Sequence, residues 1–104
     1  MNFKVWYYKH FDYTVPMIQE WVMVKEVLAN TLEDVFMMMQ AEEWSPNGEA
    51  RPLIRSLGLT HTSMSVGDFI EDNQGKFYRV NSCGFSQAMN ALPVDETISA
   101  GSFF

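Results

Sequence analysis

The sequence predicts an α+β domain in which a small, mainly antiparallel sheet of about four strands packs against one main helix, with one or two short helices. Three patterns predict this class: alternating aromatic residues near the start, a helical repeat over residues 31–42, and a polar turn between two strand-like runs over residues 69–80. The 104 residues suit one domain, 1–104. We expect residues 95–104 to form a flexible tail.

The first two strands are predicted from different patterns. A period of two, typical of a half-buried strand, predicts a strand over residues 2–11. The alternating apolar residues are Phe3, Val5 and Tyr7. β-Branched valines predict a second strand over residues 21–28, and a bulge near Lys25 or Glu26 accounts for its broken alternation.

Helical spacing follows this second strand. Asn30 suits a helix N-cap and Glu33 completes a capping box, which predicts a helix over residues 31–42. Its apolar positions are Leu32, Val35, Phe36 and Met39. A short helix is predicted over residues 52–57, because Pro suits its first turn and Gly58 suits a left-handed end cap.

The last third of the chain predicts a hairpin and a short helix. The turn at residues 73–75 contains Gly75 and separates strand-like runs at 69–72 and 76–80. Residues 85–92 have an apolar face at helical spacing and end before a Pro, which predicts a short amphipathic helix.

Composition restricts the possible functions. Thirteen acidic residues against seven basic ones give a formal net charge of −6, which argues against direct nucleic-acid binding. The acidic balance indicates solubility or, alternatively, an acidic mimic of a nucleic acid. Cys83 is the single cysteine, so an intrachain disulfide is excluded and a cytoplasmic location is predicted. No apolar run approaches the length of a membrane span.

One segment carries candidate catalytic side chains. His61, Ser63, Ser65 and Asp68 supply in principle a base, hydroxyl nucleophiles and an orienting carboxylate, as in a small hydrolase or transferase. Hydroxyl and carboxylate side chains before a strand more often satisfy backbone donors in a turn. The turn interpretation is therefore favoured, and the prediction is that the protein is not an enzyme.

No pattern predicts a cofactor or a metal. The two histidines lack the spacing of a zinc site, and no glycine-rich loop precedes a helix. Cys83 fits a small buried hydrophobe better than a reactive thiolate. Arg51 and Arg55 could share one helix face and bind an anion, although pairing with the abundant carboxylates is the favoured alternative.

Four side chains are predicted to contact a partner. Met37 and Met38 fall on the outer face of the predicted helix, and Trp6 and Tyr8 belong to the aromatic first strand. Tyr, Trp and Met are enriched at protein interfaces. The sequence therefore favours a non-enzymatic accessory domain that binds a protein partner or self-associates, and that binds neither nucleic acid nor membrane.

Part of the chain resembles a known family. Residues 61–68 (HTSMSVGD), 75–80 (GKFYRV) and 82–85 (SCGF) are similar to the YodL-like family of small phage and plasmid proteins. Residues 32–36, with Trp44 downstream, resemble the part that precedes this pattern. The resemblance implies a phage or mobile-element origin and a location in the host cytoplasm. It implies no activity, cofactor or catalytic residue.

Overall fold

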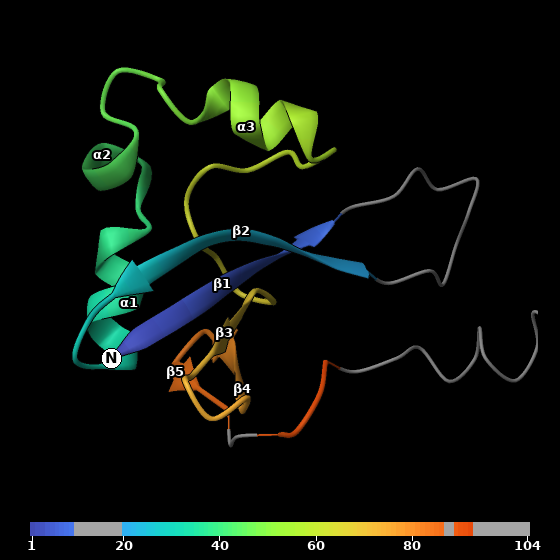
Figure 1. The fold of residues 1–104 in the computed structure, drawn as a ribbon. Helices are drawn as coiled ribbons and strands as arrows, with labels where there is room; N and C mark the ends of the chain where they lie inside the picture. The colour runs from blue at the N-terminus through green and yellow to red at the C-terminus, as the bar shows by residue number, and fades with distance from the viewer. Residues whose placement is uncertain (10–19, 87–88, 93–104) are drawn as a thin grey trace, which may run out of the picture.

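A five-stranded antiparallel sheet with a few short helices forms the fold in a computed structural model that describes residues 1–9, 20–86 and 89–92 (Figure 1). The strand order is β2-β1-β3-β4-β5. The elements are β1 (Asn2–Lys9), β2 (Glu20–Leu28), α1 (Leu32–Met38), α2 (Ala41–Trp44), α3 (Arg51–Ser56), β3 (Phe69–Glu71), β4 (Phe77–Asn81) and β5 (Gly84–Phe85). The predicted α+β class is confirmed, whereas the strand number and the single main helix are corrected. The predicted end of the first strand at Phe11 and the tail 95–104 lie outside the described residues.

The β1–β2 pair supplies much of the core. Phe3, Val5 and Tyr7 of β1 are buried on one face, as the period of two predicted. The register changes because Val5 pairs with Lys25 while Trp6 pairs with Met23. Val24 is thus the extra residue, next to the predicted bulge position. The bulge lets both Val24 and Val27 face the core although they are three residues apart.

The predicted helix over residues 31–42 is two helices. Thr31, not Asn30, is the N-cap of α1, and its Oγ1 accepts a hydrogen bond from the Asp34 amide at 3.1 Å. The helix breaks at Gln40, whose backbone is extended. The Gln40 side-chain amide donates to the carbonyl oxygens of Phe36 and Met64, so a segment distant in sequence holds the break.

The short third helix ends as predicted. Pro52 lies in the first turn of α3, where its missing N–H leaves no helical bond unmade. Gly58 has φ of 74°, its amide donates to Arg55, and the Leu59 amide donates to Ile54. These two bonds form a Schellman motif, which fixes the direction in which residues 59–68 leave the helix.

The predicted hairpin is confirmed, but the helix predicted after it is wrong. β3 pairs with β4 across a turn in which Gly75 has φ of 81°. β4 then pairs with β5, which is the strand that the sequence did not predict. Met89 pairs with Phe77, so the described part of residues 85–92 follows the edge of β4 and does not form a helix. Cys83, expected to be buried, is exposed in the β4–β5 turn.

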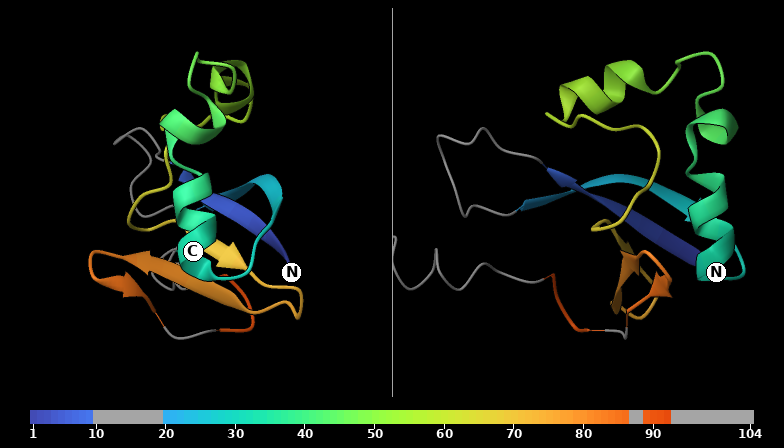
Figure 2. Two further views of the ribbon diagram at one scale, coloured as in Figure 1. Left: turned by 90° about the vertical axis from the view of Figure 1, so that its left-hand side faces the viewer. Right: turned by 180° about the vertical axis from the view of Figure 1, so that it is seen from behind.

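The helices and the main core lie on one face of the sheet. Residues 59–66 run back between α3 and the β1–β2 pair, and α1 lies beside the β3–β5 part of the sheet (Figures 1 and 2). Core residues come from β1, β2, α1, α3 and this segment. The opposite face of the sheet carries a second, aromatic group of residues, and the two faces provide different candidate surfaces.

Candidate functional site

Residues 59–68 form an anchored segment on the helical face. The Tyr7 hydroxyl donates to the Thr62 carbonyl oxygen at 2.7 Å, and the Trp44 indole donates to the same oxygen at 3.0 Å. The Met64 amide donates to the Met39 carbonyl oxygen at 3.1 Å. Bonds from β1, α2 and the C-cap of α1 thus hold the backbone of this segment in place.

His61 and Asp68 are brought together as the sequence suggested. The His61 Nε2 lies 2.9 Å from Asp68 Oδ2, and the Asp68 side chain is only 1% exposed. Asp68 also accepts from the backbone amides of Tyr8 at 2.7 Å and Ser65 at 2.8 Å. Trp6 is the last residue of β1 that pairs with β3, and beyond it the Asp68 carboxylate accepts from the Tyr8 amide, while Tyr8 still pairs with Trp21 of β2.

Tyr7 packs directly on this pair. Its ring stacks on the His61 ring, with centroids 4.6 Å apart and an interplanar angle of 14°. Burial raises the pKa of the Tyr7 phenol well above its ordinary value near 10, and the negative charge of Asp68 raises this pKa further. The phenol is therefore a neutral donor to the backbone at physiological pH, not a proton-transfer group.

The candidate hydroxyls take other partners or face solvent. The Ser63 Oγ accepts from the Ala41 amide at 2.8 Å, at the first residue of α2. Ser65 is exposed, and it approaches Asp68 through its backbone amide. In a serine hydrolase the nucleophilic hydroxyl is hydrogen-bonded to the histidine that acts as the base. The structure thus assembles His61 with Asp68, whereas the Ser63 hydroxyl serves as a cap for α2.

Replacing Ser63 by Ala is expected to lower the free energy of unfolding by about 1 kcal/mol, the usual cost of losing a helix cap. The Ala41 amide would lose its acceptor at a half-buried site. Chemical denaturation measures the difference. The matched control is Ser65→Ala, which removes an exposed hydroxyl and should change stability by less than about 0.5 kcal/mol. Equal losses in the two variants would refute the capping role.

Two predicted interaction residues, Trp6 and Tyr8, lie in an aromatic cluster on the opposite face of the sheet. The cluster consists of Trp6, Tyr8, Trp21, Phe69 and Phe77. Trp6 packs edge-on against Phe77 and donates its indole N–H to Glu71, while Tyr8 packs against Trp21. Phe69 is fully buried. Trp6 and Tyr8 are consequently half-buried packing residues of this face.

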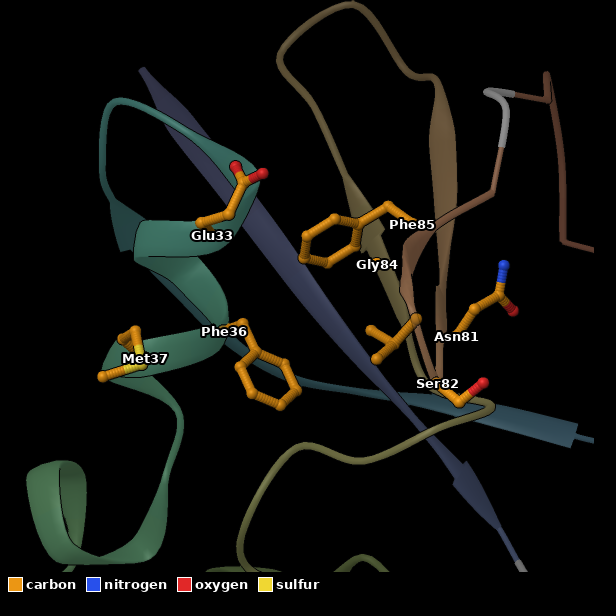
Figure 3. A pocket seen from close by; sticks show the side chains of 8 residues that line it. Glu33, Phe36, Met37, Asn81, Ser82, Gly84 and Phe85 are labelled. Atoms are coloured by element: carbon orange, nitrogen blue, oxygen red, sulfur yellow. The ribbon is translucent and has the colours of Figure 1, made fainter.

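An apolar groove lies between α1 and the β4–β5 hairpin (Figure 3). We call it the α1–β5 groove, and its cavity volume is about 270 Å³. Its main lining residues are Glu33, Phe36 and Met37 from α1, and Val80, Ser82 and Phe85 from the hairpin. The rings of Phe36 and Phe85 point into the space from opposite sides (Figure 3). Met37, one of the predicted interaction residues, is 61% exposed at the rim.

Polar groups surround this apolar floor. Glu33 lies in the first turn of α1, and Asn81 and Ser82 lie on the hairpin side. The Asn81 side-chain amide donates to the Ser86 hydroxyl, which holds one wall of the groove. The groove can therefore bury an apolar side chain while its rim contacts polar or basic groups of the same ligand.

The sequence identified only part of this groove. Met37 was predicted to face a partner, but the opposing wall from Val80 and Phe85 was missed because residues 85–92 were predicted to be helical. The residue that could have revealed this wall from the sequence is Gly84. Its φ of 139° suits the tight β4–β5 connection better than a helix. Met38, the other predicted methionine, is 40% exposed and does not line the groove.

The chain matches no family model, no curated protein and no solved structure. Within the described residues, no three His, Cys, Asp or Glu side chains are grouped so that they could hold a metal ion. None of the helices in this part of the chain has the length and apolar character needed to cross a membrane.

Proposed function

We propose that the protein is a non-enzymatic protein-interaction domain whose α1–β5 groove binds a peptide segment of a partner. The segment has one apolar anchor side chain with Lys or Arg beside it. The observation that carries this proposal is an open apolar groove with an exposed methionine and a carboxylate at its rim, Met37 and Glu33.

The groove size supports a side-chain anchor. Pockets for drug-sized ligands usually measure about 300–1,000 Å³. At about 270 Å³ the groove suits one large aliphatic or aromatic side chain better than a nucleotide or flavin. Burying such a side chain contributes about 1.5–3 kcal/mol, and a methionine at the rim adapts its shape to different anchors.

Charge supports a basic ligand. Glu33 and Asp34 both lie in the first turn of α1, and the chain carries a formal charge of −6. A negative field accelerates the approach of a basic segment and disfavours acidic ones. The apolar floor supplies affinity, and the acidic rim supplies selectivity.

A structural role for the candidate catalytic residues also supports a non-enzymatic function. Asp68 is occupied by two backbone amides and His61, and Ser63 caps α2. The hydrolase or transferase hypothesis requires the Ser63 hydroxyl to leave the Ala41 amide, or the exposed Ser65 hydroxyl to reach His61. We extend the proposal to an accessory role in a phage or other mobile element, acting in the host cytoplasm, as the family resemblance implies.

Selection from a random peptide library displayed on phage tests the proposal. The selected peptides are expected to share an apolar residue next to Lys or Arg. Met37→Glu is expected to weaken their binding at least about tenfold, because a charge at the rim opposes burial of the anchor. Glu33→Lys is expected to remove the preference for basic neighbours. Fluorescence anisotropy with one selected peptide measures both effects.

The matched control is Met23→Glu, because Met23 is a 43% exposed methionine on β2, away from the groove. It should leave binding unchanged, and both variants should keep the wild-type stability within about 0.5 kcal/mol. Peptides that bind Met37→Glu as tightly as the wild type would overturn the groove assignment. Purely basic peptides without a shared apolar residue would also overturn it, and would favour the acidic-mimic alternative.

A further inference from the structure

A second hollow lies between α3 and residues 59–62, apart from the α1–β5 groove. It has a volume of about 240 Å³, and its lining residues are Arg51, Ile54, Arg55, Leu59, Thr60 and Thr62. The two arginines stand four residues apart, so they are neighbours on one face of the helix. Two of the seven basic residues of the chain thus meet at one small cavity.

Among the described residues, neither arginine is neutralised by a carboxylate. Within residues 1–9, 20–86 and 89–92, no Asp or Glu lies within ion-pair distance of Arg51 or Arg55. The sequence favoured ion pairs between these arginines and the abundant carboxylates. Such pairs are therefore absent from the described part of the chain. Two adjacent guanidinium groups repel each other, and an anion between them would remove this repulsion.

The other lining residues suit an oxyanion with an organic part. Threonine hydroxyls donate hydrogen bonds, and guanidinium groups bind phosphate oxygens in a bidentate manner. Ile54 and Leu59 are buried and provide an apolar floor. Two cations, two threonines and an apolar floor together fit a phosphate monoester better than a cation or an apolar ligand.

Neighbouring contacts hold this cavity in place. The Schellman motif after α3 fixes the start of the segment that carries Thr60 and Thr62. The Thr62 carbonyl oxygen is held by Tyr7 and Trp44. Arg51 packs over Gly48, where an added Cβ would lie 3.4 Å from the Arg51 Nε. Little rearrangement is needed on binding, which reduces its entropic cost.

The acidic net charge does not prevent anion binding at this site. The screening length at physiological salt is about 8 Å, so carboxylates beyond this distance contribute little to the potential in the cavity. The same reasoning predicts that binding weakens as salt is added. We propose that the cavity between α3 and residues 59–62 is a binding site for a phosphate monoester, carried by a small metabolite or by a phosphorylated peptide.

An NMR titration of the ¹⁵N-labelled protein at constant ionic strength tests this proposal. The probes are inorganic phosphate, ribose 5-phosphate and a short phosphoserine peptide. Saturable amide shifts are expected over residues 51–62. The Arg51→Gln/Arg55→Gln double variant is expected to weaken binding at least about tenfold, because both charged hydrogen-bond donors are lost. Tighter binding of ribose 5-phosphate assigns a metabolite, and tighter binding of the peptide assigns a phosphorylated partner.

The control is the Lys76→Gln/Arg79→Gln double variant, which removes the same charge from two exposed positions on and before β4. It should bind phosphate as the wild type does. Equal weakening in the two double variants would show a general charge effect and overturn the proposal. Shifts that grow linearly with phosphate, or that lie outside residues 51–62, would also overturn it.

Discussion

Asp68→Ala is expected to lower the free energy of unfolding by about 3 kcal/mol, because the carboxylate accepts three hydrogen bonds at a buried position. Its removal takes this acceptor from the amides of Tyr8 and Ser65 and takes the carboxylate from His61. For a domain of this size the loss corresponds to a decrease in melting temperature of roughly 12–24 °C. Thermal and chemical denaturation measure both quantities.

Asp72→Ala is the matched control for this prediction. Asp72 accepts from the backbone amides of Gln74 and Lys76 in the β3–β4 turn and from the Tyr78 hydroxyl. The bonds to the two amides are exposed, so water replaces the lost carboxylate there and the expected cost is about 1 kcal/mol. If both variants lost the same stability, the claim that Asp68 is a structural centre would fail.

Stability is expected to fall above pH 10 by up to about 1.4 kcal/mol per pH unit because of Tyr7. The pKa of the Tyr7 phenol is raised in the folded protein, first by burial and then by the charge of Asp68. Below pH 10 the phenol is neutral in both states, so its contribution is fully present. Above pH 10 only the unfolded state releases the proton, and rising pH therefore favours unfolding.

Tyr7→Phe isolates this effect. At pH 7 the variant should lose about 1 kcal/mol, because the Thr62 and Met39 carbonyl oxygens lose a donor. Between pH 10 and pH 11.5 its stability should decline less steeply than that of the wild type, so the two curves converge. Tyr78→Phe is the comparison: burial and the Asp72 carboxylate also raise the pKa of Tyr78, so its loss removes a separate alkaline contribution and leaves the Tyr7 effect in place. Parallel curves for Tyr7→Phe and the wild type would contradict the assignment.

The parts of the fold that depend on residues close together in the sequence were predictable. The alternation in β1, the Gly75 turn and the Pro52–Gly58 limits of α3 all express local backbone and burial preferences. The break at Gln40 was not predictable in this way, because it depends on a hydrogen bond to Met64. The β5 strand was missed for a similar reason, since pairing with β4 overrides a helical pattern.

The same distinction applies to the candidate sites. His61 and Asp68 are seven residues apart, and the turn chemistry of the segment already favoured their structural role. The α1–β5 groove joins Phe36 to Phe85, which only the folded chain places side by side. Arg51 and Arg55 were visible as a pair, but their lack of carboxylate partners in the described part of the chain required the structure.

The most direct test of the proposed function is chemical-shift mapping of the ¹⁵N-labelled protein with a phage-selected peptide. The proposal predicts that the largest amide shifts occur in α1 and the β4–β5 hairpin, near Met37 and Gly84, and that Met37→Glu abolishes them. Largest shifts around Trp6 and Tyr8, on the opposite face of the sheet, would contradict the groove and assign binding to the aromatic cluster instead.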